Sequence, residues 1–156
     1  MIKMLRLDER LIHGQVAFAW TNSLGVDCIF VINDDVADNK LRMTSLKLAA
    51  PGGVKFVAKS VDDAIELLNG NKTDKYKLFL IVDNTADALR LVKEVKDVNH
   101  VNLGNMKVKE GAQALTPSIA VTEADVENIR EMLAAGAEVE CRAVPTDKKI
   151  MVETLI

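Results

Sequence analysis

Short apolar runs alternate with longer segments of helical periodicity along the whole chain. Two runs, 27–33 and 76–82, are apolar nearly throughout, which is typical of strands buried on both faces of a parallel sheet. The other runs that predict strands are 1–7, 55–58, 101–103, 118–121 and 138–144. The last of these alternates polar and apolar residues, as a strand nearer the edge of the sheet would.

The segments between these runs predict helices. Helical spacing is expected over residues 16–24, 38–50, 60–69, 85–95 and 122–133. Thr85 is expected to cap the fourth helix, while Ser60 and Thr122 each begin a capping-box pattern with Asp in place of Glu. Gly136 is placed to end the fifth helix, and a short amphipathic helix is expected from about 147 to 155.

Strands and helices therefore alternate without a repeat, a linker or a low-complexity segment. This order predicts the α/β class, with an open, doubly wound, mostly parallel twisted sheet and helices on both faces. Turn signals at Gly111 and Pro117 favour an irregular hairpin within 106–117. Because 156 residues suffice for one sizeable core, residues 1–156 are expected to form a single domain.

Charge and composition narrow the classes of partner. A net charge of −3, with no basic run interleaved with aromatic residues, argues against nucleic-acid binding. Cys28 and Cys141 lack metal-ligand or disulfide spacing, so two buried, reduced thiols and no metal or cofactor are expected. No apolar run is long enough to span a bilayer and no signal-peptide pattern begins the chain, so we expect a cytoplasmic protein that meets a membrane only through partners.

Polar clusters follow several of the predicted strands, and one cluster contains one of the two histidines of the chain. The clusters are 8–13, 33–35, 83–85 and 104–105. The carboxyl ends of parallel strands share one edge, where open α/β sheets bind ligands. Polar loops are common at strand ends in any fold, so His13 is the informative residue. It lies in the first strand-to-helix turn, where unpaired N–H groups and a partial positive charge would receive an anion.

The segment around His13 carries a specific resemblance. The sequence Asp8-x-Arg10-Leu11-Ile12-His13-Gly14-Gln15-Val16 resembles the active-site loop of the enzyme IIB subunits of the mannose/fructose/sorbose family. These subunits belong to the bacterial phosphoenolpyruvate-dependent sugar phosphotransferase system. The resemblance continues through 33–37, 41–42, 49–51, 104–106 and 142–145, and so covers nearly the whole chain. It implies an open, largely parallel sheet with one antiparallel strand.

The resemblance also implies a function. His13 would accept a phosphoryl group from a phosphohistidine of a IIA partner and pass it to a sugar held by the membrane subunits IIC and IID. A neutral imidazole suits such a relay because it is a good nucleophile near neutral pH. The family implies Nδ1 as the reacting nitrogen, which the residues alone do not decide.

The neighbours of His13 offer groups that suit a phosphoryl oxygen. Arg10 could supply a planar fork for two phosphate oxygens. Gly14 lets the backbone approach closely, and its N–H with that of Gln15 could complete a cradle. Asp8 could hold the ring nitrogen opposite the reacting one, or merely pair with Arg6 or Arg10.

Other residues near this edge keep alternative interpretations. Arg6 is expected to be a strand-end charge, and Arg42 either reaches the shared edge or lies on a solvated helix face. Asp34, Asp35 and Asn84 could shape the pocket or a partner surface, or be ordinary loop residues. An exposed apolar patch around His13, including Leu11 or Ile12, is expected to serve the partners. His100 is expected to be a structural or surface histidine, and Trp20 to pack in the core, with contact to a partner as the alternative.

Two other classes of function are left open. A regulator on the same fold could read the phosphorylation of a partner without onward transfer to sugar. A flavodoxin-like protein that binds a small molecule is disfavoured, because no glycine-rich phosphate loop occurs. The sequence does not distinguish mannose, fructose, sorbose and amino-sugar systems.

Overall fold

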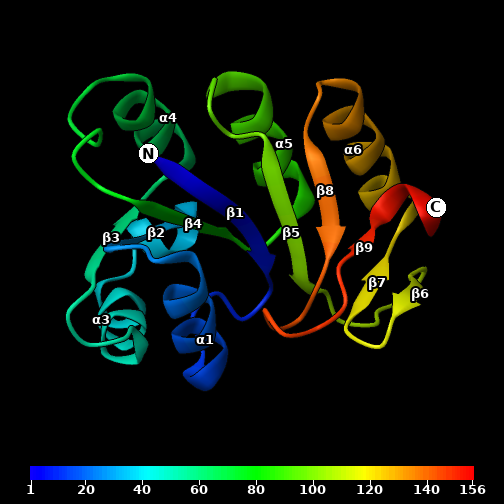
Figure 1. The fold of residues 1–156 in the computed structure, drawn as a ribbon, viewed down its shortest axis with the longest axis horizontal. Helices are drawn as coiled ribbons and strands as arrows, with labels where there is room; N and C mark the ends of the chain where they lie inside the picture. The colour runs from blue at the N-terminus through cyan, green and yellow to red at the C-terminus, as the bar shows by residue number, and fades with distance from the viewer.

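The computed structural model describes residues 1–156 and is built on a seven-stranded twisted sheet (Figure 1). The strands lie in the order β3 (Lys55–Lys59), β2 (Cys28–Ile32), β4 (Leu78–Val82), β1 (Ile2–Asp8), β5 (His100–Asn105), β8 (Glu138–Cys141) and β9 (Ile150–Met151). All neighbouring pairs are parallel except β8 with β9. The predicted α/β class, with a mostly parallel sheet and one antiparallel strand in it, is confirmed.

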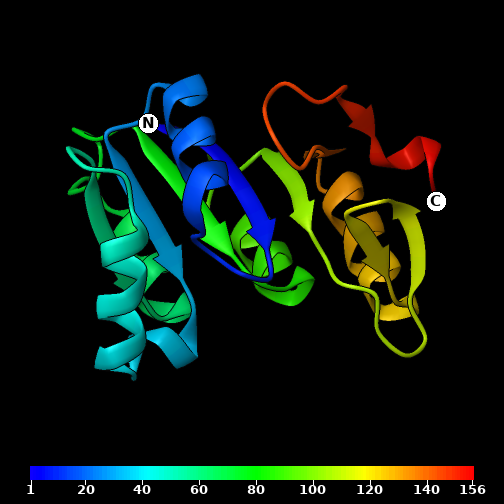
Figure 2. The same cartoon turned by 90° about the horizontal axis from the view of Figure 1, so that it is seen from below.

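Helices cover both faces of this sheet (Figures 1 and 2). One face carries α1 (Gly14–Leu24), α2 (Asp34–Ala37) and α3 (Lys40–Ala49), which pack over a cluster of 12 buried apolar residues. The other face carries α4 (Val61–Asn69), α5 (Thr85–Glu94) and α6 (Glu123–Ala134), over a cluster of 26. β2 and β4 are buried at every position, which explains their uninterrupted apolar sequences.

β1 lies at the centre of the sheet and separates the two clusters. Leu5 and Leu7 belong to the cluster under α4, α5 and α6, whereas Met4 belongs to the cluster on the α1 face. Because side chains alternate along a strand, Arg6 and Asp8 point to the same face as Met4. The carboxyl end of β1 thus delivers two charged side chains beneath α1, next to the loop that carries His13.

The prediction of a helix over 147–155 is wrong. Ile150 and Met151 form β9, which pairs with Cys141 and Glu140, and a 3₁₀ turn, η1 (Val152–Thr154), follows. The apolar positions of this short segment fit either structure. Pairing of β9 covers the backbone edge of β8 that would otherwise be left open, and it brings Val152 into the core.

The start of α5 also differs from expectation. Asn84, not Thr85, caps the helix, because its side chain accepts a hydrogen bond from the Asp87 N–H at 2.8 Å. The Thr85 hydroxyl is buried and donates instead to Asp125 of α6 at 2.7 Å. The capping box that begins with Thr122 is present, and the Ser60 side chain caps α4.

A hairpin is present, but it lies further along the chain than the expected residues 106–117. β6 (Gln113–Thr116) pairs antiparallel with β7 (Ile119–Val121), so 118–121 forms an arm of the hairpin and not a strand of the main sheet. A single bridge between Met106 and Ile119 ties the hairpin to the end of β5. Figure 2 shows the hairpin beside the C-terminal segment.

Both cysteines are buried and unpaired, as expected. Burial raises the pKa of each thiol to about 11, so both stay protonated at neutral pH. No helix has the length and apolar character needed to cross a bilayer.

Candidate functional site

The loop between β1 and α1 is held in an unusual backbone conformation. Leu11 is the only residue other than glycine with a positive φ, at 59°, a region that a leucine rarely occupies. Its N–H donates to the Asp8 carbonyl oxygen at 2.9 Å, and its side chain and that of Ile12 are buried in the α1-face cluster. The expectation that Leu11 or Ile12 forms an exposed patch is therefore wrong. The two side chains anchor the loop and leave Arg10 and His13 facing outward.

His13 is the residue that precedes α1. Its backbone is extended and its side chain does not cap the helix, so the ring is free to make other contacts. The side chain is 21% exposed. Gly14 and Gln15, the first residues of α1, are exposed, and Gly14 has a φ of 45° that favours glycine. Their N–H groups form the positive end of the helix directly beside the ring.

Asp8 is completely buried and accepts hydrogen bonds on both oxygens. Nε2 of His13 lies 2.8 Å from Oδ2, and Nη2 of Arg6 lies 3.0 Å from the same atom. The backbone N–H of Arg10 donates to Oδ1 at 2.9 Å, and Nδ2 of Asn105 lies 3.4 Å from it. Both roles that the sequence left open for Asp8 therefore occur together, since it binds the histidine ring and also pairs with Arg6.

The protonation state of Asp8 follows from these contacts. Burial raises the pKa of this carboxyl, but attraction to Arg6 and the hydrogen bonds from His13 and Arg10 outweigh it. The pKa of Asp8 therefore lies below its usual value, and the group is ionised at neutral pH. An ionised carboxylate can only accept, so Nε2 of His13 carries a proton. In a neutral ring the lone pair is then on Nδ1, and the Arg10 guanidinium contacts that nitrogen.

Arg6 is not the strand-end surface charge that we expected. It is 2% exposed, with Nη1 2.6 Å from Oδ1 of Asn102 and its guanidinium 5.4 Å from the centre of the Trp20 ring. Trp20 itself is in the core, as expected, and its Nε1 donates to the Ala143 carbonyl oxygen at 3.1 Å. A charged residue at a strand end is ordinarily exposed, so nothing in the local sequence indicated this burial.

The remaining candidate residues do not join His13. Asn84 caps α5, and Oδ1 of Asp34 accepts the Val61 N–H at 2.9 Å, so both stabilise helix starts. Asp35 is exposed, and the Arg42 side chain on α3 makes no hydrogen bond or ion pair, in keeping with a solvated helix face. His100 pairs with Glu138 and Glu140 on β8, in keeping with its expected structural role.

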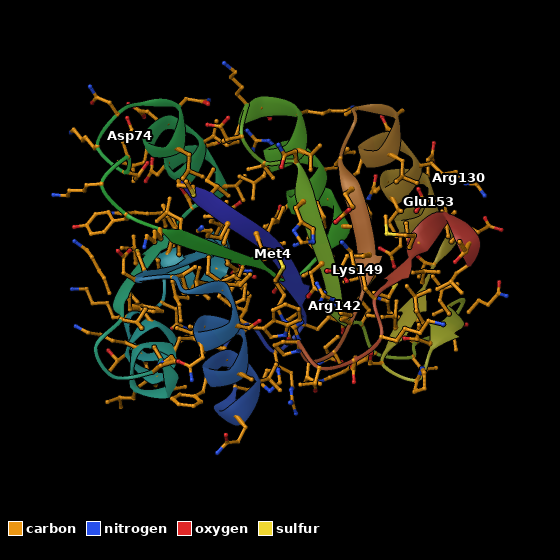
Figure 3. All side chains as sticks on the ribbon, viewed as in Figure 1. Met4, Asp74, Arg130, Arg142, Lys149 and Glu153 are labelled. Carbon is orange, nitrogen blue, oxygen red and sulfur yellow. The ribbon has the colours of Figure 1, made fainter.

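Sequence reasoning missed a group of buried polar residues behind the loop. Glu140 is completely buried and is bonded by Arg142, His100 and Asn102. Burial raises the pKa of this carboxyl, but the hydrogen bonds from His100 and Arg142 bring it down to about 2. Arg142 lies beside the carboxyl ends of β1 and β5 (Figure 3), and its carbonyl oxygen is 3.2 Å from Nη1 of Arg6.

Phe18 of α1 contributes exposed apolar surface beside Gly14 and Gln15, the residues that follow His13. This side chain is 52% exposed and lines a depression of about 350 Å³ together with Gly14, Gln15, Ala49 and Pro51. The depression therefore lies between the start of α1 and the end of α3, next to the exposed N–H groups. Phe18, and not Leu11 or Ile12 as expected, therefore contributes exposed apolar surface close to the histidine.

The fold and the loop together define a class of protein, an α/β protein that presents a histidine ring at the N-terminus of its first helix. Residues 2–156 match the family described as the PTS system sorbose subfamily IIB component. The chain therefore belongs to the IIB components of the mannose/fructose/sorbose family of the bacterial sugar phosphotransferase system.

Individual relatives agree with this family. The chain is 32% identical, over all of its length and 99% of the relative, to a probable phosphotransferase enzyme IIB component of Streptococcus pyogenes. It is 36% identical to the mannose-specific EIIAB component of Escherichia coli, of which it spans 48%. The crystal structure of the IIBSor domain of the sorbose permease from Klebsiella pneumoniae is similar with a TM-score of 0.92 and 29% identity, covering 97% of this chain and 93% of that one.

Proposed function

We propose that this protein is a phosphoryl carrier, a protein-N(π)-phosphohistidine–sugar phosphotransferase of the IIB type. His13 accepts the phosphoryl group from a phosphohistidine of a IIA partner and passes it to a sugar bound by the membrane subunits IIC and IID. One observation carries the proposal: Asp8 binds Nε2 of His13 at 2.8 Å, which leaves Nδ1 beside Arg10 at the exposed start of α1. Family membership supports a role in phosphoryl transfer.

Acceptance is a displacement at phosphorus. The lone pair of Nδ1 forms the new N–P bond while the N–P bond of the donor breaks and its electron pair returns to the donor ring. Asp8 stabilises the positive charge that develops on the His13 ring. Arg10 binds two of the three equatorial phosphoryl oxygens, and the N–H groups of Gly14 and Gln15 bind the third at the positive end of α1. In the onward step a sugar hydroxyl attacks the phosphorus and loses its proton to a base or to water, and Nδ1 leaves with its electron pair.

The partners follow from the family. The E. coli relative is named as an EIIAB component, and this name supports a IIA partner for the present chain. Two proteins must bring their histidines together around one phosphoryl group, so the surface next to His13 must be accessible. The half-exposed Phe18 beside the site suits such an encounter. In this proposal the protein works in the cytoplasm and reaches the inner face of the membrane through IIC and IID.

The test is intact-protein mass after incubation with phosphoenolpyruvate, the general phosphotransferase components and a cognate IIA protein. We expect one acid-labile phosphoryl group, located on His13 by peptide mapping. A folded sample that several IIA proteins leave unmodified would overturn the proposal, as would modification at another residue. Acceptance on His13 without onward transfer in the presence of sugar and IIC/IID would instead assign the protein a regulatory function.

Replacing Arg10 by Ala is expected to slow acceptance by roughly 100- to 1000-fold, the usual effect of removing one group that stabilises transition-state charge. Arg10 is exposed, so the free energy of unfolding should change by no more than about 0.5 kcal/mol. Arg10→Lys should recover part of the rate, because it keeps the charge and loses the planar fork. The wild type, Arg10→Ala and Arg10→Lys are compared by their single-turnover rates with phosphorylated IIA.

The matched control is Arg130→Ala. Arg130 is exposed on α6, on the opposite face of the sheet from α1 (Figure 3). Its replacement removes the same charge from the protein and should leave the rate unchanged. Equal rates of phosphoryl acceptance for wild type and Arg10→Ala would show that Arg10 is only a surface charge.

A further inference from the structure

A row of buried polar side chains crosses three neighbouring strands behind the candidate site. Arg6 of β1 is the register partner of Asn102 of β5, which is in turn the register partner of Glu140 of β8. Arg6 is 2% exposed, and Asn102 and Glu140 are completely buried. Charged groups are almost never buried to this extent unless they are paired, and their desolvation is costly.

Arg6 is held from several directions. Nη1 donates to Oδ1 of Asn102 at 2.6 Å and to the Arg142 carbonyl oxygen at 3.2 Å, and Nη2 donates to Oδ2 of Asp8 at 3.0 Å. The guanidinium also lies 5.4 Å from the centre of the Trp20 ring. These contacts fix both the position and the orientation of the fork, so Arg6 presents one N–H group to Asp8 in a defined direction.

β5 makes room for this guanidinium at Gly104. A Cβ atom at that position would lie 2.1 Å from Cζ of Arg6 and 2.2 Å from Nη1, distances that no two such atoms adopt. Glycine at residue 104 is therefore explained by the space that the guanidinium occupies. The backbone of one strand and the side chain of the next are fitted to each other at this point.

We propose that Arg6 is a positioning residue for the phosphoryl transfer of His13, an inference that rests on the function proposed above. Arg6 does not reach the phosphoryl group and acts through Asp8. Held by Asn102, it keeps Asp8 as a carboxylate and aims Oδ2 at Nε2 of His13. The ring proton then stays on Nε2, and Nδ1 is free to attack.

Stability alone does not explain this arrangement. A buried ion pair gains little or nothing over apolar residues of similar volume, because both charges lose their hydration. An apolar side chain could pack against Trp20 and cover β1 without that cost. We explain the buried charge of Arg6 by its effect on Asp8. The Asp8 carboxylate is hydrogen-bonded to both Arg6 and His13.

Removal of Arg6 has a specific consequence for the histidine ring. Without the guanidinium, the pKa of Asp8 rises, because the attraction to Arg6, the largest of the contributions that lower it, is lost while the effect of burial remains. A protonated Asp8 can donate to Nε2, and the proton of a neutral His13 ring then moves to Nδ1. The nitrogen that must attack phosphorus would carry a proton and lose its nucleophilic lone pair.

The experiment compares the tautomer of His13 and the rate of acceptance in the full chain. The ¹⁵N chemical shifts of the His13 ring are measured near pH 8 in wild type, Arg6→Met, Arg6→Lys and the control Arg130→Lys. The control alters an exposed arginine on α6, on the opposite face of the sheet from α1 and outside the buried polar row (Figure 3). Single-turnover rates with phosphorylated IIA are measured on the same samples, at several IIA concentrations.

We expect the wild type and Arg130→Lys to have the proton on Nε2 and to share one rate. Arg6→Met should move the population toward the Nδ1–H tautomer. Its rate at saturating IIA should fall by roughly 10- to 100-fold, by analogy with the loss seen when the hydrogen-bond partner of a metal-binding histidine is removed. The IIA concentration for half-maximal rate should not change, because Arg6 is buried and cannot contact a partner.

A folded Arg6→Met protein with the wild-type tautomer and rate would overturn the inference. If Arg6→Met does not fold, Arg6→Lys decides, since it keeps a positive charge but cannot bind Asp8 and Asn102 with one planar fork. A Lys variant identical to wild type in both measurements would also overturn it, and a shifted tautomer would support it. Failure of the proposed function is a separate result, because it would appear as a wild-type protein that never accepts phosphate on His13.

Discussion

Replacing His13 by Ala is expected to abolish phosphoryl acceptance and leave the protein folded. The ring is the only nucleophile at the start of α1, and no neighbouring side chain can take its place. Arg10 is always protonated, and Asp8 is completely buried with both oxygens already bonded. The measurement is the mass of the protein after incubation with phosphoenolpyruvate, the general components and IIA, with circular dichroism and urea unfolding on the same sample.

The stability cost of this substitution should not be enough to unfold the protein. His13 is hydrogen-bonded to Asp8 at 2.8 Å and to the exposed guanidinium of Arg10, and its side chain is partly exposed. A hydrogen bond to a charged group is worth about 1.5–3 kcal/mol. Asp8 keeps its bonds from Arg6, the Arg10 N–H and Asn105, so it is not left as an unpaired buried charge. A loss of activity in a folded protein can therefore be assigned to the missing ring.

The second histidine provides the matched control. His100 is partly exposed and bonded to carboxylates, like His13, but it lies on β5 next to Glu138 and Glu140. His100→Ala should accept the phosphoryl group at the wild-type rate. Acceptance by His13→Ala at any substantial level, or loss of acceptance in a folded His100→Ala protein, would assign the transfer to another group.

The strands of the sheet were predictable from the sequence where every residue of the strand is buried. β2 and β4 are buried at every position, so their sequences are continuous apolar runs. β5 was predicted only over 101–103, although it extends from His100 to Asn105. Gly104 and Asn105 interrupt the apolar pattern, and both serve the polar network, since one leaves space for Arg6 and the other contacts Asp8.

The residues of the candidate site were likewise only partly predictable from the sequence. Asp8, Arg10, His13 and Gly14 lie in one short loop or at its two ends, so their spacing alone indicated that they would be neighbours. Asn102, Glu140 and Arg142 come from distant strands, and only the register of the folded sheet brings them to Arg6. The positive φ of Leu11, which turns that residue inward, was equally invisible because leucine does not favour it.

Gly104→Ala should be among the most destabilising single-methyl substitutions in this protein. The new Cβ would overlap the Arg6 guanidinium, which cannot simply move aside because Trp20, Asn102 and Asp8 surround it. Displacing Arg6 leaves Asp8 as a buried charge without its main partner. Breaking a buried ion pair costs about 3–5 kcal/mol, and we expect a decrease in the free energy of unfolding of this size. Urea unfolding at neutral pH measures it.

Gly52→Ala is the control for the added methyl group. A Cβ at Gly52 meets nothing within 4 Å, and its φ lies outside the range that favours glycine, so stability should change by no more than about 0.5 kcal/mol. If both alanine variants unfold at the wild-type urea concentration, the space at Gly104 is not needed for Arg6.

A double-mutant cycle separates the overlap with Arg6 from any other effect of the methyl group. In an Arg6→Ala background the guanidinium is absent, so Gly104→Ala should cost much less than it does in wild type. The difference between the two costs is the coupling free energy of residues 6 and 104, and it should account for most of the effect. Equal costs in both backgrounds would assign the destabilisation to β5 itself. A large coupling would show that glycine at residue 104 serves the arginine that Asp8, and through it His13, depends on.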